Sequence, residues 1–408
     1  MNEELYQILK QSCNSNGLPV MNRSQFVATV DKFGKEDFRT TLAEYITKEK
    51  PPFPFHEFDQ KKVVDTFHKL VKADFTDFVT TSKNDRVIEK YDDYKYPYSK
   101  YGLGVIEASP KFNYVSDSFM NDLRLACGSY GYKSPVQRWN DCDNLWGAFG
   151  PIFRGVNDTQ ELNGRIFIMA FRLGTYIATQ FKPIVAKVIY EMSDAKTVLD
   201  TSMGWGDRLT GFYASNATHY IGCDPNPNTF ARYKKMIEFY DKLTGGKKTT
   251  QIYNCGAEDL PWNEIKNVDC AFTSPPYFST ERYNEGGEKE ELQSWAKFNE
   301  YDKWRDDFFL PVSEQCIKKS KHTLINIMDP KIKGKRYRTG DELCDKYKEK
   351  FKGQIGMRIM QRPKSDKLFK DEQEKKEFMN NIFIENIWYF SNENTDLFKK
   401  STLDEFFA

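Results

Sequence analysis

The sequence predicts an α/β protein with a mostly parallel sheet, helices on both faces of that sheet and a separate N-terminal lobe. From about residue 165, short apolar runs alternate with amphipathic stretches of helical length, as in successive βαβ units. The chain has 408 residues. A single hydrophobic core seldom grows beyond roughly 250 to 300 residues, so we expect a second lobe.

The expected elements follow in chain order. The first clear strand is 197–200, followed by a turn over 201–206 and a helix from Asp207. The next strand is 220–224. A helix over 228–243 has apolar residues three and four positions apart, and Gly245 follows where a helix commonly ends. The remaining expected elements are strands 251–254, 268–273, 323–328 and 382–390, and a helix over 301–319.

Composition limits the possible classes of protein. The formal net charge is only +1, so any affinity for nucleic acid must come from local patches. The eight cysteines form no C-x-x-C pair and no Cys/His spacing typical of zinc, so we expect no metal site. The N-terminus lacks the features of a secretion signal, and no long uncharged apolar run is present. These patterns predict a cytoplasmic protein that is not secreted.

Polar residues at three successive strand ends suggest a nucleotide-like ligand. Asp200 precedes a turn that contains Gly204 and Gly206, and Asp224 ends the next strand, 24 residues later. Glu258 and Asp259 follow the third strand. Open α/β sheets bind such ligands at the carboxyl ends of their strands. Each feature also has a simpler interpretation: a plain tight turn, a helix N-cap at Asp224 and a solvated turn at Glu258 and Asp259.

The hexapeptide Thr273-Ser-Pro-Pro-Tyr-Phe278 closes the strand 268–273. Pro275 and Pro276 fix the backbone and remove two N–H donors. Ser274 and the Pro275 carbonyl can accept hydrogen bonds from an exocyclic amine, while Tyr277 can stack on a flat base. The motif therefore predicts a site that grips a base.

This ordered set of motifs resembles the S-adenosylmethionine-dependent methyltransferases that modify exocyclic amines of DNA bases, at adenine N6 or cytosine N4. The likeness covers roughly residues 170 to 330 and extends toward 392. It implies a Rossmann-like class I methyltransferase sheet, S-adenosyl-L-methionine as cofactor and DNA as partner, with the target base flipped out. The residues that it implies for the cofactor are Lys182, Pro183, Asp200, Ser202, Gly204, Gly206, Asp224, Glu258 and Asp259. The catalytic residues that it implies are Ser274, Pro275, Pro276 and Tyr277.

The sequence departs from the family pattern at two points. Thr201-Ser-Met203 stands where an aromatic and small residues are usual, so the methionine pocket can differ in shape. Ser274 begins the catalytic motif, which favours cytosine N4 over adenine N6 while leaving both open. Methylation at cytosine C5 needs a cysteine nucleophile, which the motif lacks.

Further residues are candidates for substrate contact. Phe278 can stack on a base, although packing in the core is the stronger alternative for it, and Arg282 can meet a phosphate or lie in a solvated loop. Residues 331–376 contain 16 basic and 8 acidic residues. Within them, Lys333, Lys335, Arg336 and Arg338 form the clearest phosphate-binding candidate.

Four regions are expected: an N-terminal accessory lobe over 1–150, a catalytic core over 151–330, a basic insertion over 331–380, and a last core strand and tail over 381–408. Target recognition by the first lobe is a hypothesis from its position alone. Two alternatives to the DNA enzyme stay open. One is a methyltransferase that acts on RNA or a protein amide, and the other is an inactive methyltransferase-like partner that binds nucleic acid.

Overall fold

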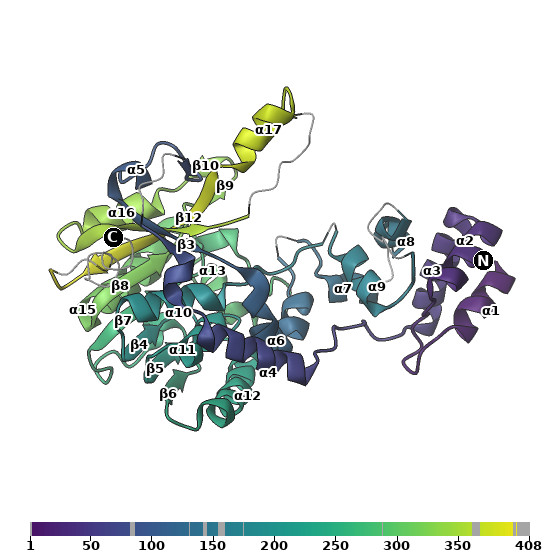
Figure 1. Ribbon diagram of the computed structural model, residues 1–408, viewed down its shortest axis with the longest axis horizontal. Coiled ribbons are helices and arrows are strands. Elements are labelled where there is room, and N and C mark those ends of the chain that lie inside the picture. The colour runs from purple at the N-terminus through teal and green to yellow at the C-terminus, as the bar shows by residue number, and fades with distance from the viewer. Residues whose placement is uncertain are drawn as a thin grey trace. The chain divides into compact units, whose positions relative to one another are not determined.

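The computed structural model describes residues 2–81, 86–129, 131–141, 145–153, 160–173, 175–287, 289–360, 368–394 and 397. The chain forms two compact units (Figure 1). The smaller unit combines Met1–Asp59, Asn121–Thr179 and Arg282–Glu290, and the larger one combines Gln60–Met120, Gln180–Glu281 and Glu291–Ala408. These units do not divide at residue 150, because residues 60–120 supply three strands of the large sheet and belong with it. Parts of the expected basic insertion and tail, 361–367 and 398–408, lie outside the described residues.

The smaller unit is built from helices around an aromatic core. Its helices are α1 (Glu3–Gln11), α2 (Arg23–Phe33), α3 (Lys35–Glu49), α7 (Pro135–Asp141), α8 (Leu145–Phe149), the 3-10 turn η3 (Gly150–Phe153) and α9 (Gly164–Phe171). Helix α6 (Asn113–Ala126) begins in the larger unit and ends in the smaller one. Phe38, Phe149 and Phe167 are fully buried in one cluster, which joins the first segment of the unit to the second.

The larger unit contains a mixed sheet in the order β1-β3-β11-β12-β8-β7-β4-β5-β6, with β2 paired to β12. Its strands are β1 (Val79–Thr80), β2 (Val87–Ile88), β3 (Gly102–Glu107), β4 (Thr197–Asp200), β5 (His219–Cys223), β6 (Thr249–Tyr253), β7 (Val268–Thr273), β8 (Ser320–Asn326), β11 (Phe351–Arg358) and β12 (Ile382–Ser391). The central strands β6, β5, β4, β7 and β8 are parallel, whereas β12 is antiparallel to both of its main neighbours, β8 and β11. A separate hairpin joins β9 (Lys331–Ile332) and β10 (Lys335–Arg336).

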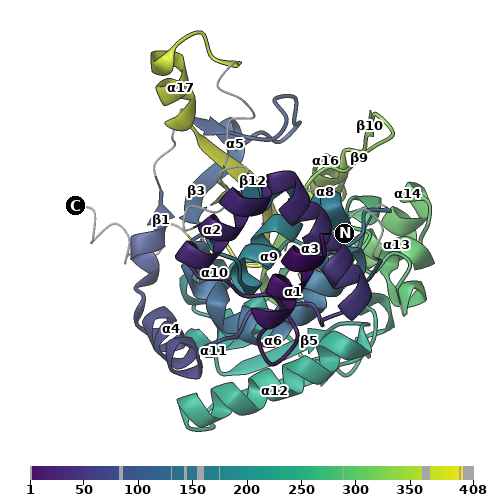
Figure 2. The ribbon, with the colours of Figure 1, turned by 90° about the vertical axis from the view of Figure 1, so that its right-hand side faces the viewer.

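Helices surround this sheet, and α4 packs beside α11 (Figure 2). The α-helices are α4 (Gln60–Lys72), α5 (Tyr98–Tyr101), α10 (Pro183–Met192), α11 (Asp207–Ala214), α12 (Pro227–Thr244), α13 (Ser294–Lys297), α14 (Tyr301–Lys303), α15 (Leu310–Lys319), α16 (Thr339–Lys346) and α17 (Glu372–Met379). The shorter turns are η1 (Phe75–Phe78), η2 (Pro110–Phe112), η4 (Ala257–Asp259), η5 (Phe278–Thr280), η6 (Glu290–Leu292) and the π-helical η7 (Trp304–Phe309).

Two adjacent residues of β7 show that helices cover both faces of the sheet. The Phe272 ring packs against Tyr190 of α10, with ring centroids 6.2 Å apart. Ala271 lies in the core cluster that contains Cys316 of α15. Because successive strand residues point to opposite faces, α10 and α15 cover opposite sides. This arrangement, with the antiparallel β12 inserted beside β8, is the expected class I methyltransferase fold.

Most of the predicted elements are confirmed. Strands 197–200 and 268–273 have the predicted bounds, and Gly245 caps α12 with a left-handed φ of +72°. The predicted helix 301–319 is interrupted, because six of its residues, 304–309, form the π-helical η7. Strands β3 and β11 were not predicted, and they extend the sheet beyond β12.

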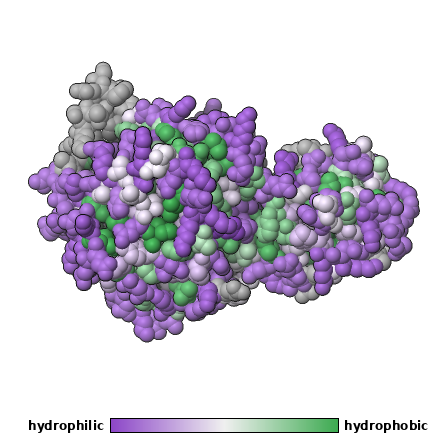
Figure 3. All heavy atoms as spheres, turned by 90° about the horizontal axis from the view of Figure 1, so that it is seen from below, coloured by the Kyte–Doolittle hydropathy of each residue, from purple (hydrophilic) through white to green (hydrophobic). Residues whose placement is uncertain are grey.

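The surface has no single large apolar face in the view of Figure 3. Hydrophilic side chains predominate there, and the hydrophobic ones lie in separate patches. Apolar side chains scattered in this way are normal on a protein surface.

Candidate functional site

The turn after β4 needs glycine at two positions for different reasons. Gly204 and Gly206 have φ of +55° and +75°, where side chains are disfavoured. A Cβ atom at Gly206 would lie 2.6 Å from the end of the Met236 side chain, which would have to shift to make room for it. At Gly204 the nearest atom to such a Cβ is the Ser202 carbonyl oxygen at 3.7 Å. The space over Gly204 therefore allows a ligand to approach the backbone closely.

Asp200 stabilises this turn through hydrogen bonds of its buried carboxylate. It is fully buried, and its carboxylate accepts hydrogen bonds from Arg208 Nε at 3.0 Å and the Tyr220 hydroxyl at 2.7 Å. The Ser202 backbone N–H donates to the same carboxylate at 3.1 Å. We expected Asp200 to bind the cofactor itself, but its carboxylate is occupied by protein donors. Arg208, which neutralises it, was not predicted.

Asp224 links the glycine turn to the start of α12. Its carboxylate accepts from the Gly204 N–H at 3.0 Å, the Asn226 N–H at 2.9 Å and the Thr229 hydroxyl at 2.9 Å. The side chain that caps α12 is that of Asn226, so Asp224 is not itself the N-cap. Asp224 is 8% exposed, and burial raises the pKa of its carboxyl despite these hydrogen bonds.

The other expected cofactor residues lie at neighbouring strand and helix ends. Glu258 and Asp259 form η4 after β6, and both accept from Lys297 Nζ, at 2.6 Å and 3.2 Å. Lys182 immediately precedes α10, whose first residue is the buried Pro183. Lys182 Nζ donates to the Gln180 carbonyl at 2.7 Å.

A serine joins the glycine turn to the hexapeptide. Ser202 Oγ donates to the Ser274 carbonyl oxygen at 2.8 Å and lies 2.6 Å from the Thr273 hydroxyl oxygen. Thr201 Oγ1 donates to the same Thr273 hydroxyl at 3.0 Å. Because β4 and β7 are adjacent parallel strands, their following turns meet at one sheet edge. The structure thus brings together the two motifs that the sequence analysis singled out.

Tyr277 is turned inward and does not offer its ring as a free stacking surface. The residue is 6% exposed and belongs to the core under the sheet. Its hydroxyl bonds to Asn326 Oδ1 at 3.0 Å and makes a short hydrogen bond to Glu385. Ser274 Oγ lies 3.3 Å from this hydroxyl, and Ser274 is only partly buried. Ser274 is therefore the accessible end of a polar cluster that continues inward through Tyr277.

The positions of Phe278 and Arg282 argue against the roles expected for them. Phe278 is 5% exposed and packs against Tyr301 and Trp304, with ring centroids 5.7 and 5.8 Å apart. The alternative of core packing is therefore correct for Phe278. Arg282 belongs to the smaller unit and forms an ion pair with Glu285 at 3.0 Å.

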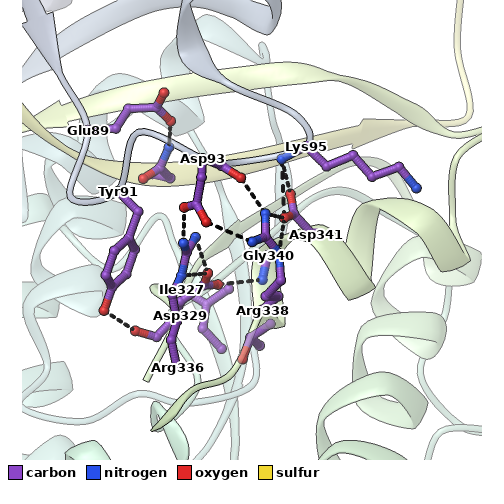
Figure 4. Close-up of polar contacts among 12 residues, drawn as sticks. Glu89, Tyr91, Asp93, Lys95, Ile327, Asp329, Arg336, Arg338, Gly340 and Asp341 are labelled. Carbon is purple, nitrogen blue, oxygen red and sulfur yellow. Dashed lines mark hydrogen bonds and ion pairs between the residues drawn. The ribbon is translucent and has the colours of Figure 1, made fainter. Parts of the chain in front are cut away.

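The basic segment contains two arginines that are already neutralised (Figure 4). Arg336 forms ion pairs with Asp329 at 2.7 Å and with Asp93, and its guanidinium lies 3.7 Å from the Tyr91 ring centroid. Arg338 pairs with Asp341 at 2.7 Å and with Asp93 at 3.0 Å. Arg336 and Arg338 thus fasten the hairpin to the segment around Asp93, and their contact with phosphate stays a prediction.

The lysines of the same hairpin are presented to solvent. Lys331, Lys333 and Lys335 are exposed, and Lys333 occupies the turn with φ of +48°. Lys335 Nζ lies 4.6 Å from the Tyr337 ring centroid. We call these three residues the hairpin lysines. They remain available as a phosphate-binding surface.

Sequence reasoning missed Arg208, Asn326 and Glu385. Glu385 and Asn386 interrupt the apolar run of β12, and this pair of polar residues in a buried strand was a usable signal. Asn326 is the last residue of β8. It lies inside the predicted strand 323–328, where the apolar pattern gave no reason to single it out. Arg208 lies in the first turn of α11, where an arginine is ordinarily solvated.

Two other kinds of site were not found in the part of the chain that the structure describes. No three His, Cys, Asp or Glu side chains come together there in a way that could hold a metal ion. Every helix in those ranges is too short or too polar to cross a lipid bilayer.

Comparisons with known proteins found only distant likenesses to solved structures. No protein-family model matches the chain, and no curated protein matches it. Among solved structures, the N-terminal domain of EvdMO1 with SAH bound is 11% identical, with 39% of this chain and 57% of that one covered and a TM-score of 0.26. The delta-N METTL16 methyltransferase domain is 13% identical, with coverages of 53% and 86% and a TM-score of 0.32.

An rRNA methylase from Streptococcus thermophilus is 11% identical, with coverages of 52% and 98% and a TM-score of 0.28. The chain thus spans little more than half of the EvdMO1 domain but nearly all of this methylase. The fold assignment rests on the strand order of the sheet and not on these likenesses.

Proposed function

We propose that this protein is an S-adenosylmethionine-dependent methyltransferase that acts on the exocyclic amine of a DNA base, at cytosine N4 or adenine N6. The hydrogen bond from Ser202 Oγ to the Ser274 carbonyl at 2.8 Å carries the proposal. It ties a glycine turn suited to a nucleotide-like donor to a motif suited to an amine. An enzyme that moves a group between two ligands needs this proximity.

The residues at the glycine turn fit S-adenosylmethionine. The space over Gly204 permits close approach of a ligand, and Asp224 immediately follows β5, at the sheet edge where ribose hydroxyls bind in sheets of this kind. Gly204, Gly206, Asp224 and Glu258 would hold the donor. When bound, the donor supplies a methyl group on a positively charged sulfur.

The hexapeptide supplies hydrogen-bond acceptors for the amine. An exocyclic amine is a weak nucleophile because its lone pair is delocalised into the ring. Accepting its N–H hydrogens at Ser274 Oγ and the Pro275 carbonyl would localise that lone pair and aim it at the methyl group. A base in a duplex must first be flipped out to reach Ser274.

The hairpin lysines support a nucleic acid as the substrate, and DNA is the one that we propose. Three exposed ammonium groups on one short hairpin can bind successive phosphates without reading sequence. Arg336 and Arg338 contribute by holding the hairpin in place.

A labelling experiment tests the proposal. The protein is incubated with methyl-labelled S-adenosylmethionine and, separately, with DNA, RNA and protein, and the modified nucleoside or residue is identified. We expect N4-methylcytosine or N6-methyladenine in DNA, and a large loss of label with Ser274→Ala while donor binding persists. Label only in RNA or protein would refute the DNA assignment. Donor binding without transfer to any acceptor would favour the inactive partner.

A further inference from the structure

Four oxygen atoms beside the hexapeptide share too few hydrogens for a single bonding pattern. The Tyr277 hydroxyl oxygen lies 3.0 Å from Asn326 Oδ1 and within a short hydrogen bond of Glu385 Oε1, yet it has one hydrogen to donate. Ser274 Oγ lies 3.3 Å from both the Tyr277 hydroxyl and Asn326 Oδ1.

The orientation of Asn326 limits the choices. Its Nδ2 donates to the Asn386 carbonyl at 3.1 Å, which turns Oδ1 toward Tyr277 as a pure acceptor. If Tyr277 donates to Asn326, the carboxyl of Glu385 must itself donate to Tyr277 and therefore be protonated. If Glu385 is ionised, Tyr277 donates to Glu385, and the Ser274 hydroxyl can donate either to Asn326 or to the Tyr277 oxygen. The cluster thus has two hydrogen-bond patterns that differ by one proton on Glu385.

The surroundings of Glu385 favour reversible protonation of its carboxyl group. Burial raises the pKa of the Glu385 carboxyl, while Tyr277, Asn326 and the charges of Lys90 and Lys182 oppose this rise. Burial also raises the pKa of Tyr277, and the negative charges of Glu385 and Glu281 add to that effect. Tyr277 therefore stays neutral and can pass a proton without holding a charge, whereas Glu385 can take up the charge change.

We propose that Ser274, Tyr277 and Glu385 form a proton relay that removes the proton released by the acceptor amine. The inference rests on the proposed methyl transfer. In that reaction the bond from carbon to the donor sulfur breaks and the bond from carbon to the amine nitrogen forms. The nitrogen then loses one proton to Ser274 Oγ, the Ser274 hydrogen passes to Tyr277, and the Tyr277 hydrogen passes to the Glu385 carboxylate. The donor leaves as a neutral thioether, and Glu385 later releases the proton to water.

In this relay Glu385 is a positioning residue and proton acceptor that acts through Tyr277 and does not touch the substrate. Rates at saturating donor and acceptor should therefore rise with pH through the pKa of Glu385 and then level off, because the relay needs the ionised carboxylate. Affinity for the donor should not follow this curve, since the donor lies at the glycine turn.

The test measures the pH profile of single-turnover methyl transfer with labelled S-adenosylmethionine and the acceptor that the wild type modifies. We expect Glu385→Gln and Tyr277→Phe each to slow transfer by about 100-fold and to flatten the acid limb, with the donor Kd changed less than about threefold. Glu89→Gln is the matched control. Glu89 is also a partly buried acid whose pKa burial raises, and it bonds to Asn386, but it lies outside the relay. This control should keep the wild-type profile.

Two results would overturn the relay. One is an unchanged acid limb in Glu385→Gln, or in Tyr277→Phe if the former fails to fold. The other is an infrared titration of the free wild-type protein. The relay is refuted if the carboxyl signal that Glu385→Gln removes titrates no higher than that of an ordinary glutamate. The infrared titration needs no methyl transfer. A protein that modifies no acceptor would therefore refute the proposed function, while the spectrum would still decide whether Glu385 exchanges a proton.

Discussion

The side chain of Ser202, in the turn after β4, donates a hydrogen bond to the main-chain carbonyl of Ser274, in the turn after β7, at 2.8 Å. This hydroxyl is one of the links, with the Thr201–Thr273 hydrogen bond and the pairing of β4 and β7, that hold the proposed donor and acceptor sites together. Ser202→Ala should remove this link and leave the fold intact. We expect kcat to fall about 5-fold with a smaller change in donor Kd, because one hydrogen bond contributes about 1 kcal/mol. Ser193→Ala, which removes a similar hydroxyl at the end of α10, should leave both constants unchanged.

Asp224 should govern donor affinity more than the rate of transfer. Its carboxylate accepts a hydrogen bond from the Gly204 N–H and so holds the glycine turn in place beside the proposed donor site. Asp224→Asn should weaken S-adenosylmethionine binding by about 10- to 100-fold, as loss of a charged hydrogen-bond acceptor does. Equilibrium binding by calorimetry measures this, with Asp241→Asn on α12 as the control. A selective fall in kcat with unchanged donor affinity would contradict our assignment of the pocket.

Arg208 should be essential for stability. It neutralises Asp200 at 3.0 Å in a fully buried position. Arg208→Met leaves that carboxylate without its counter-ion, and we expect the free energy of unfolding to fall by about 3 to 5 kcal/mol. Urea unfolding measures the change. Arg305→Met, which removes more exposed ion pairs with Asp302 and Asp306, should cost less than about 1 kcal/mol.

Asp269 should stabilise the fold in a pH-dependent way. Burial alone would raise the pKa of its carboxyl, but hydrogen bonds from Lys321, Thr197 and Lys196 lower it to about 2. A carboxyl whose folded pKa is depressed contributes stability above its unfolded pKa and loses it as the pH falls. Asp269→Asn should therefore be about 2 kcal/mol less stable than the wild type at neutral pH. This difference should shrink between pH ~4 and pH ~2, as measured by urea unfolding at each pH.

The hairpin lysines should contribute non-specific affinity for DNA. Replacing Lys331, Lys333 and Lys335 together by alanine should weaken binding equally for unrelated sequences. It should also reduce the slope of log K against log salt by up to about 3, because each phosphate contact contributes about 0.9. Lys234, Lys235 and Lys247 are exposed around α12 and provide a charge-matched control triple. Equal losses in both triples would indicate a general charge effect and no phosphate site.

The sequence was sufficient for the parts of the fold and site that depend on local pattern. The bounds of β4 and β7 could be read because their residues are buried on both faces and so form continuous apolar runs. The glycines and the proline pair also allow a prediction of backbone conformation, because glycine favours turns with positive φ and proline fixes φ. Since parallel strands place their carboxyl ends together, the meeting of the two turns could also be inferred.

Contacts between distant segments could not be predicted. Arg336 meets Asp93 across 243 positions, and Tyr277 meets Glu385 across 108. From sequence alone, a run of basic residues is taken to be solvated, because the acids that pair with it in the fold are not known. In the same way, a tyrosine ring is taken to be free for stacking, because the hydrogen bonds of its hydroxyl are not known. For the same reason Phe278 was proposed for stacking, although Tyr301 and Trp304 enclose it.

The smaller unit is assembled from three separate stretches of chain, the last of which ends at Glu290. During synthesis, helices α1 to α3 emerge long before Phe149 and Phe167, which complete their core. The apolar side chains of those helices therefore stay unburied until about a hundred further residues have been synthesised. The same interleaving means that trimming the N-terminus would not excise a module. It would uncover apolar residues of the same core that remain behind, such as Phe149 and Phe167, and we expect such fragments to aggregate.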